Sequence, residues 1–194
     1  GMLEEVEILG KSIEGIFWET GARQLHTAEN ESERERLWSG RKGAIGAMGT
    51  LAPNYYLVDG VVPRTKLTQV MRDVLKITQE EGFPVANIFH AGDGNIHPCI
   101  LFDEREPGVV KKVMSIGERI LQVCVEAGGT LTGEHGVGLE KKEQMPLVFT
   151  EEDMNAMKKV RSAFSPLERF NPGKIFPGGP EYHESMQRKA IAKA

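Results

Sequence analysis

Cysteine is scarce in this chain, which has only Cys99 and Cys124 among its 194 residues. Two thiolates are too few to ligate an iron–sulfur cluster. They also lie outside any C-x-x-C pattern that would indicate a redox pair or a zinc site. We therefore interpret both as small buried hydrophobic residues of a protein in a reducing compartment.

Long apolar runs and an excess of positive charge are also missing. No stretch approaches the ~20 apolar residues of a membrane-spanning helix, and the start lacks the charged and then apolar pattern of a secretory leader. The net charge of −4 provides no basic field for nucleic acid. We therefore expect a cytoplasmic protein that is not transmembrane and binds no nucleic acid. Peripheral attachment at the inner face of the membrane is the alternative location.

Periodic apolar patterns are present over most of the chain. Helical spacing predicts helices over 3–17, 32–49, 63–82 and 107–127. The second of these begins with a capping box of Ser32 and Glu35. Residues typical of strands occupy 23–27, 55–62, 85–90, 96–102 and 130–132. From residue 55 onward the order is β-α-β-β-α-β, which predicts a ferredoxin-like α+β fold with a mixed or antiparallel sheet and helices over one face.

The last 45 residues have a different pattern. Thr150 and Asp153 are typical of the start of a helix, and the segment 170–180 is too rich in proline and glycine for regular structure. Beyond Glu181 we expect a solvated or loosely helical tail. The sequence thus predicts a ferredoxin-like domain over 1–149, followed by a helical segment and tail over 150–194.

Two histidines flank a predicted hairpin turn. His90 ends one strand and His97 begins the next, with the glycine-rich segment 91–95 between them. Opposed residues of an antiparallel pair have Cβ atoms about 4.5–5.5 Å apart, so two imidazoles there can share one metal ion. A hairpin with two incidental histidines is the alternative interpretation.

A Glu-His pair lies among three glycines at 133–138. Adjacent side chains of a regular strand point to opposite faces, so the backbone must leave strand geometry if Glu134 and His135 serve one site. With His90 and His97, Glu134 completes the ligand set of a catalytic metal that keeps an open position, and zinc, iron and manganese all suit it. His135 is then the natural general base. A surface loop that happens to hold both residues is the alternative.

Arg41 is a further candidate, on the second predicted helix and three residues after Trp38. A guanidinium can bind a substrate carboxylate through two hydrogen bonds. A solvated or aromatic-packed side chain is the commoner role of such an arginine.

The chain resembles the C-terminal domain of FAD-linked oxidases of the vanillyl-alcohol oxidase type from about residue 30 to 177. Glycolate oxidase FAD-binding subunits and D-lactate dehydrogenases are the most similar members. Four segments carry the resemblance, in the same order and at similar spacing: Leu37–Lys42, His90–Pro98, Gly133–Gly138 and Asn171–Lys174.

The resemblance implies that the chain is the cap domain of a two-domain flavoenzyme, truncated at its N-terminal side, and that the FAD-binding domain is absent from it. It assigns a role to each matching residue. His135 takes the hydroxyl proton while hydride passes to FAD, and Arg41 binds the substrate carboxylate. The remaining implied roles are metal ligation by His90, His97 and Glu134 and cofactor binding by Asn95, Asn171 and Lys174.

The activity that the resemblance implies is oxidation of glycolate or D-lactate to the 2-oxo acid, in an enzyme that needs its FAD-binding domain. Members that oxidise 2-hydroxyglutarate carry Thr and Lys where this chain has Ile45 and Leu57, which favours a short monocarboxylate. The implied partners are this 2-hydroxy acid, the FAD-binding domain and other oxidase subunits. A stand-alone His-His-Glu metal hydrolase and a non-catalytic ferredoxin-like binding module are the alternatives.

Overall fold

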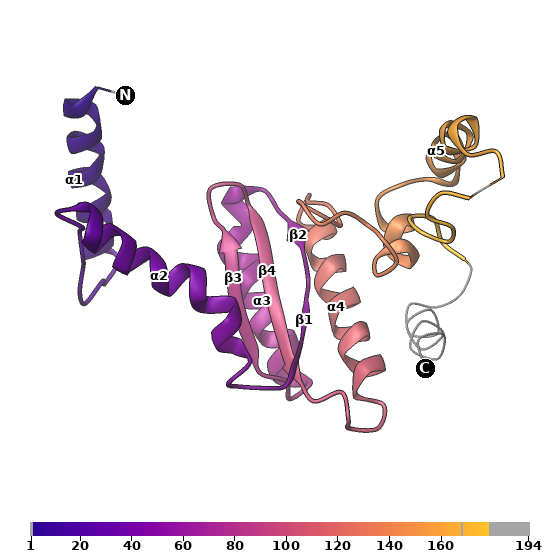
Figure 1. The fold of residues 1–194 in the computed structure, drawn as a ribbon, viewed down its shortest axis with the longest axis horizontal. Helices are drawn as coiled ribbons and strands as arrows, with labels where there is room; N and C mark the ends of the chain where they lie inside the picture. Colours follow the sequence, from indigo (N-terminus) through magenta and orange to yellow (C-terminus); the bar gives the residue numbers. More distant parts are fainter. Residues whose placement is uncertain (1, 168, 179–194) are drawn as a thin grey trace. The chain divides into compact units, whose positions relative to one another are not determined.

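The structure is a computed structural model that describes residues 2–167 and 169–178 (Figure 1). It separates into two compact units, Gly1–Ile45 and Gly46–Ala194. The division predicted between residues 149 and 150 stays a prediction.

The first unit consists of α1 (Leu3–Glu19) and most of α2 (Glu31–Met48). Both helices were predicted, and α2 ends beside Gly49 as expected. Its start is held by contacts other than the predicted capping box: the Asn30 side chain accepts the N–H of Glu33 at 3.0 Å, and the Glu33 carboxylate accepts the N–H of Glu29 at 2.9 Å. The strand predicted over 23–27 is wrong, because these residues have no strand partner and an unpaired strand has no stability of its own.

The second unit holds the sheet and the remaining helices. Its elements are β1 (Asn54–Leu57), β2 (Gly60–Val61), the 3-10 helix η1 (Arg64–Lys66), α3 (Leu67–Glu80), β3 (Val85–His90), β4 (Asn95–Phe102), α4 (Val109–Glu126), the 3-10 helix η2 (Lys142–Leu147) and α5 (Glu151–Phe164). The predicted order is confirmed as far as α4. The strand predicted over 55–62 is interrupted at Val58 and Asp59, which separate β1 from β2.

Strand β4 lies at the centre of the sheet, paired with β1 and β2 on one side and with β3 on the other. All these pairings are antiparallel. The last predicted strand, 130–132, is reduced in the described residues to one antiparallel bridge between Thr130 and Val61. The spatial arrangement is that of a ferredoxin-like fold, which confirms the α+β class.

Helices α3 and α4 cover one face of the sheet. Val74 of α3 and Ile120 of α4 belong to the same buried cluster as Ile96 and Ile100 of β4. Because side chains alternate along a strand, His97 points to the opposite face. That face carries a smaller apolar cluster of Met48, Cys99 and Leu101.

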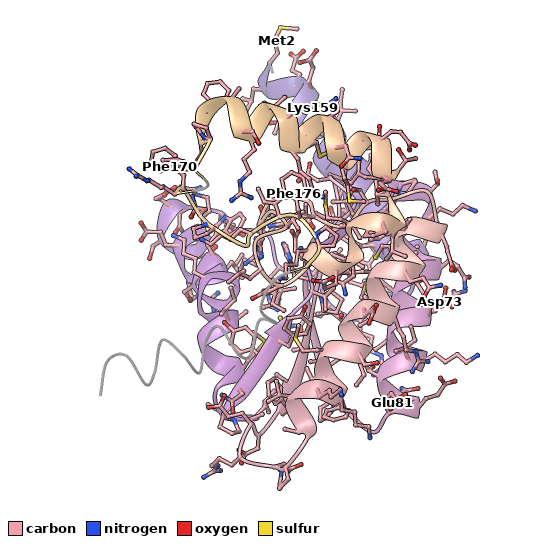
Figure 2. All side chains as sticks on the ribbon, turned by 90° about the vertical axis from the view of Figure 1, so that its right-hand side faces the viewer. Met2, Asp73, Glu81, Lys159, Phe170 and Phe176 are labelled. Atoms are coloured by element: carbon pink, nitrogen blue, oxygen red, sulfur yellow. The ribbon has the colours of Figure 1, made fainter. Side chains whose placement is uncertain are left out.

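Helix α5 begins with the predicted cap, since the Thr150 hydroxyl accepts the N–H of Asp153 at 3.2 Å. The irregular segment after it packs back toward the helix, with Phe176 beneath α5 and Phe170 at the outer turn (Figure 2). The tail predicted after Glu181 lies outside the described residues. Within the described residues, no helix is both long and apolar enough to cross a membrane.

Candidate metal and acid–base site

The β3–β4 hairpin brings His90 and His97 together, as predicted. Their register is diagonal, because His90 pairs with Asn95 and His97 pairs with Ile88. The two ring centroids are 5.6 Å apart and the rings are nearly perpendicular. The turn needs glycine at 94, where φ is +73° and a Cβ would lie 2.1 Å from the Val62 carbonyl oxygen.

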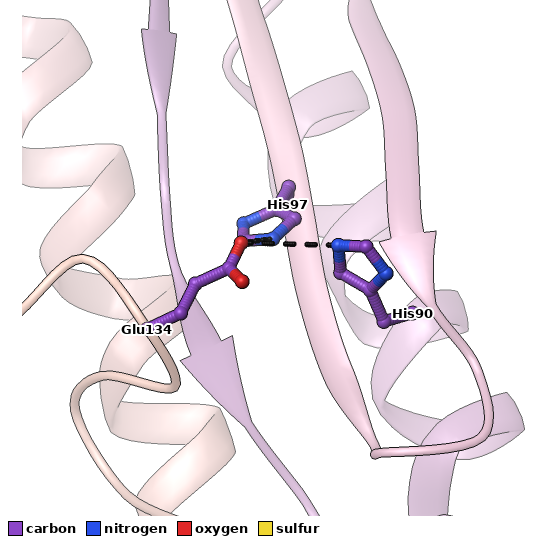
Figure 3. A group of neighbouring side chains, drawn as sticks. All are labelled: His90, His97 and Glu134. Carbon is purple, nitrogen blue, oxygen red and sulfur yellow. Dashed lines mark ion pairs between the residues drawn. The ribbon is translucent and has the colours of Figure 1, made fainter. Parts of the chain in front are cut away.

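The loop after α4 brings Glu134 to the same point (Figure 3). Its Oε1 atom lies 2.9 Å from His97 Nε2 and 3.8 Å from His90 Nε2. One ligand atom from each of the three residues lies within 4.8 Å of the other two. Side chains from β3, β4 and this loop therefore converge in the way that one cation requires.

His97 supports a fit to a cation by its own environment. Its side chain is only 5% exposed, yet neither ring nitrogen has a hydrogen-bond partner among the described residues. The 2.9 Å contact with Glu134 thus lacks hydrogen-bond geometry. Buried polar atoms normally have a partner, and a divalent cation between these donors would provide one.

Burial holds the pKa of His97 below its usual range, although the charges of Asp59 and Glu134 act in the opposite direction. A lowered pKa favours the neutral imidazole. This is the form that offers a lone pair to a metal ion.

His135 lies beside the three residues. Its Nε2 atom is 3.5 Å from Glu134 Oε1, and its ring stacks on that of His97 with centroids 5.0 Å apart. The side chain is about half exposed and lines a cavity of about 480 Å³ together with Tyr55 and Leu57. An accessible imidazole in this position can take a proton from a molecule bound at the cluster.

Asp59 was not predicted from the sequence, although it is central to the site. Its side chain is fully buried and accepts hydrogen bonds from the Thr132 hydroxyl at 2.5 Å and from the N–H of Gly133 and His135 at 3.0 and 3.1 Å. Lys141, 2% exposed, donates to the same carboxylate at 3.0 Å. The available signal was a single acidic residue inside an otherwise apolar strand pattern at 55–62.

Burial by itself would raise the pKa of the Asp59 carboxyl. The hydrogen bonds from Thr132 and Lys141 and the positive charge of Lys141 outweigh it and hold this pKa well below its usual range. Asp59 is therefore a buried anion.

Asn95 lies next to the cluster and is buried. Its Oδ1 atom has no hydrogen-bond partner among the described residues. The Asn95 side chain packs against Gly133, where an added Cβ would lie 2.6 Å from Asn95 Cγ. Its expected role in cofactor binding stays a prediction.

The segment with Asn171 and Lys174 is attached to the same loop. Ile175 donates its N–H to the Gly138 carbonyl at 2.7 Å, and Arg161 of α5 donates to the Lys174 and Asn171 carbonyls at 2.9 and 2.7 Å. The Lys174 ammonium donates to Asn171 Oδ1 at 3.0 Å. The structure thus brings this segment to the end of the Glu134–His135 loop, and its role toward a cofactor stays a prediction.

Arg41 is exposed on the part of α2 that belongs to the first unit. Its expected role in carboxylate binding stays a prediction.

The profile of the family described as FAD linked oxidases, C-terminal domain, matches residues 3–175. The chain belongs to this family. This FAD-linked oxidase C-terminal domain is 41% identical over 177 residues to glycolate oxidase subunit GlcD of Escherichia coli (strain K12), an alignment that covers 91% of the chain and 36% of the relative. The corresponding Bacillus subtilis (strain 168) subunit is 34% identical over 176 residues, with 91% and 37% covered.

D-lactate dehydrogenase (cytochrome), mitochondrial, of Arabidopsis thaliana is 30% identical over 152 residues, which cover 77% of the chain and 27% of the relative. The chain thus spans little more than a third of the length of the GlcD relatives. The resemblance found in the sequence is confirmed, and the family match begins earlier in the chain than the four motifs do. FAD is the cofactor of this family of oxidoreductases.

Proposed function

We propose that this FAD-linked oxidase C-terminal domain provides the metal and acid–base half of the active site of a flavin-dependent 2-hydroxy acid dehydrogenase. The substrate would be a short monocarboxylate such as glycolate or D-lactate, oxidised to the 2-oxo acid. The convergence of His90, His97 and Glu134, with His135 beside them, carries the proposal. Relatives named as glycolate oxidase subunits and a D-lactate dehydrogenase support the substrate class.

In this proposal, His90, His97 and Glu134 hold a divalent metal ion, either zinc, iron or manganese. When bound, such an ion would lower the pKa of a substrate hydroxyl and orient the substrate, and FAD would supply the hydride acceptor. His135 takes the hydroxyl proton at its exposed ring. The alcohol thereby loses one proton and one hydride, which balances its oxidation to the ketone or aldehyde.

The preference for a short substrate is supported by Leu57. It pairs with Cys99 in the sheet and packs in the apolar cluster on the face that carries His97. An apolar side chain cannot pair with a second, distal carboxylate, and burying an unpaired charge there is costly. A substrate with a distal carboxylate is thus disfavoured.

The metal site can be tested on this chain alone with Co²⁺, whose visible spectrum reports its ligands. We expect one equivalent to bind and His97→Ala to abolish binding. His26→Ala is the matched control, because His26 is exposed in the first unit. Glycolate should change the cobalt spectrum and acetate, which lacks the hydroxyl, should change it less. Failure of the wild-type chain to bind Co²⁺, Zn²⁺ or Mn²⁺ would contradict the proposal.

The role of His135 needs FAD, so it is tested with the chain joined to an FAD-binding domain of the family. We expect His135→Ala to slow flavin reduction by glycolate or D-lactate by about 10²–10⁴-fold, with metal and flavin contents unchanged. Normal flavin reduction in this variant would exclude His135 as the base. Ester hydrolysis by the chain alone, abolished by a chelator, would instead support a metal hydrolase.

A further inference from the structure

Asp59 and Lys141 form a buried ion pair beneath the proposed metal site. Asp59 lies where the strand is interrupted between β1 and β2, and Lys141 lies beyond the Glu134–His135 loop. The Lys141 ammonium donates to the Asp59 backbone carbonyl at 2.9 Å and to its carboxylate at 3.0 Å. Burying two charges is expensive unless their geometry and hydrogen bonds compensate. A gain in stability alone is therefore a weak reason for this pair to be buried.

The loop that carries Glu134 and His135 is folded around this carboxylate. The N–H groups of Gly133, Glu134 and His135 all point to Asp59, at 3.0, 3.4 and 3.1 Å. Thr132 joins them by donating its hydroxyl to Asp59 and accepting the N–H of Gly136 at 2.8 Å. Successive backbone N–H groups around one anion form a concave turn rather than a strand. This turn allows two adjacent side chains, those of Glu134 and His135, to reach the same site.

The same carboxylate also lies behind His97. Asp59 Oδ1 is 4.0 Å from His97 Nδ1, the ring nitrogen directed away from Glu134. Histidines that bind a metal through one nitrogen usually present the other to a carboxylate, carbonyl or water, which orients the ring. One buried anion thus adjoins the backbone that holds Glu134 and the ring of His97.

We propose that Asp59, held in place by Lys141, is a positioning residue that fixes the geometry of the metal site by tying the Glu134–His135 loop to the sheet. This role rests on the proposed metal site. Asp59 would contact neither the metal nor the substrate, and it would act through Glu134, His135 and His97.

The test is the Co²⁺ affinity of the 194-residue chain, measured by calorimetric titration, with the cobalt spectrum as a second readout. We expect Asp59→Asn to weaken binding by about 10–100-fold and to alter the spectrum, because the ligands are less well held. Asp73→Asn, on α3, is the matched control and should bind normally. A lowered unfolding temperature with unchanged affinity and spectrum in Asp59→Asn would show a merely structural role and overturn the proposal.

A double-mutant cycle shows whether Asp59 acts through the ligand. The affinity loss of Asp59→Asn/Glu134→Gln should be smaller than the product of the two single losses, because the second change has less left to remove. A loss in the double variant equal to the product of the two single losses would mean that Asp59 acts independently of Glu134. Amide hydrogen exchange at Gly133 and His135 should also quicken in Asp59→Asn, with or without metal.

Each of three outcomes has a separate meaning. If Asp59→Asn does not fold, the double variant Asp59→Asn/Lys141→Met replaces it, because this variant removes both buried charges and should fold. We expect the double variant to bind Co²⁺ more weakly than the wild type. Normal Co²⁺ binding by the double variant would overturn the proposal. If the wild-type chain binds no metal, the metal site fails and the positioning role fails with it. If wild type and Asp59→Asn bind metal equally, only the positioning role fails.

Discussion

The Lys141 ammonium lies 3.0 Å from the Asp59 carboxylate and joins residues 82 positions apart in the sequence. Both side chains are almost completely buried. The contact connects the segment after the Glu134–His135 loop to the start of β2. Each charge is tolerated in the interior because the other is present, so removal of either one has a predictable cost.

We predict that Lys141→Met lowers the free energy of unfolding by ~3–5 kcal/mol, because it leaves the Asp59 carboxylate buried without its counter-charge. Urea denaturation measures the change. Lys76→Met on α3 is the control and should cost less than about 0.5 kcal/mol, since Lys76 is 75% exposed. Equal stability of the two variants would show that the buried pair contributes nothing.

Gly133 offers a test of packing beside the ligands. We predict that Gly133→Ala destabilises the chain by ~1–3 kcal/mol and weakens metal binding, because its Cβ would lie 2.6 Å from Asn95 Cγ and 2.7 Å from a Val61 methyl group. Gly92→Ala in the nearby turn meets nothing within 4 Å and serves as the control. Thermal unfolding and Co²⁺ titration of both variants check this, and indistinguishable behaviour would contradict the close approach.

The two cysteines predict how stability depends on alkaline pH. Burial raises the pKa of Cys99 to about 11 and that of Cys124 to about 12, from an ordinary value of 9.0. The unfolded chain thus releases its thiol protons first as the pH rises. The contribution of the thiols to stability is complete below pH 9 and is lost between about pH 9 and 12.

Urea denaturation across this pH range measures the effect. The decline should be shallower in Cys99→Ala/Cys124→Ala than in the wild type, because lysines and tyrosines titrate in both proteins and only the thiols differ. Parallel declines would show that the thiols ionise normally in the folded chain.

Flavin binding is the fourth prediction. The 194-residue chain alone should bind no stoichiometric FAD, because the resemblance assigns the flavin mainly to another domain. Visible absorption of the purified chain after incubation with FAD and gel filtration measures this. The same treatment of the chain joined to an FAD-binding domain is the positive control. One equivalent of FAD retained by the chain alone would overturn the assignment of the flavin to another domain.

The sequence predicted correctly those elements that depend on residues close together in the chain. Apolar spacing predicted α3, α4 and the β3–β4 hairpin, since a helix or a tight hairpin depends on residues close in sequence. Thr150 and Asp153 predicted the cap of α5 for the same reason. The strand predicted over 23–27 was wrong because a strand needs a partner, and local pattern does not reveal whether one exists.

The candidate site divides in the same way. The sequence by itself determined that His90 and His97 flank one turn, and that Glu134 and His135 are adjacent among glycines that free the backbone. Tertiary structure alone decided that these two segments meet, with Glu134 2.9 Å from His97. It also decided that Asp59 holds the loop, since a carboxylate 74 to 76 residues away from its backbone donors leaves no local pattern. Long-range contacts of this kind depend on how the elements pack, so no stretch of sequence contains them.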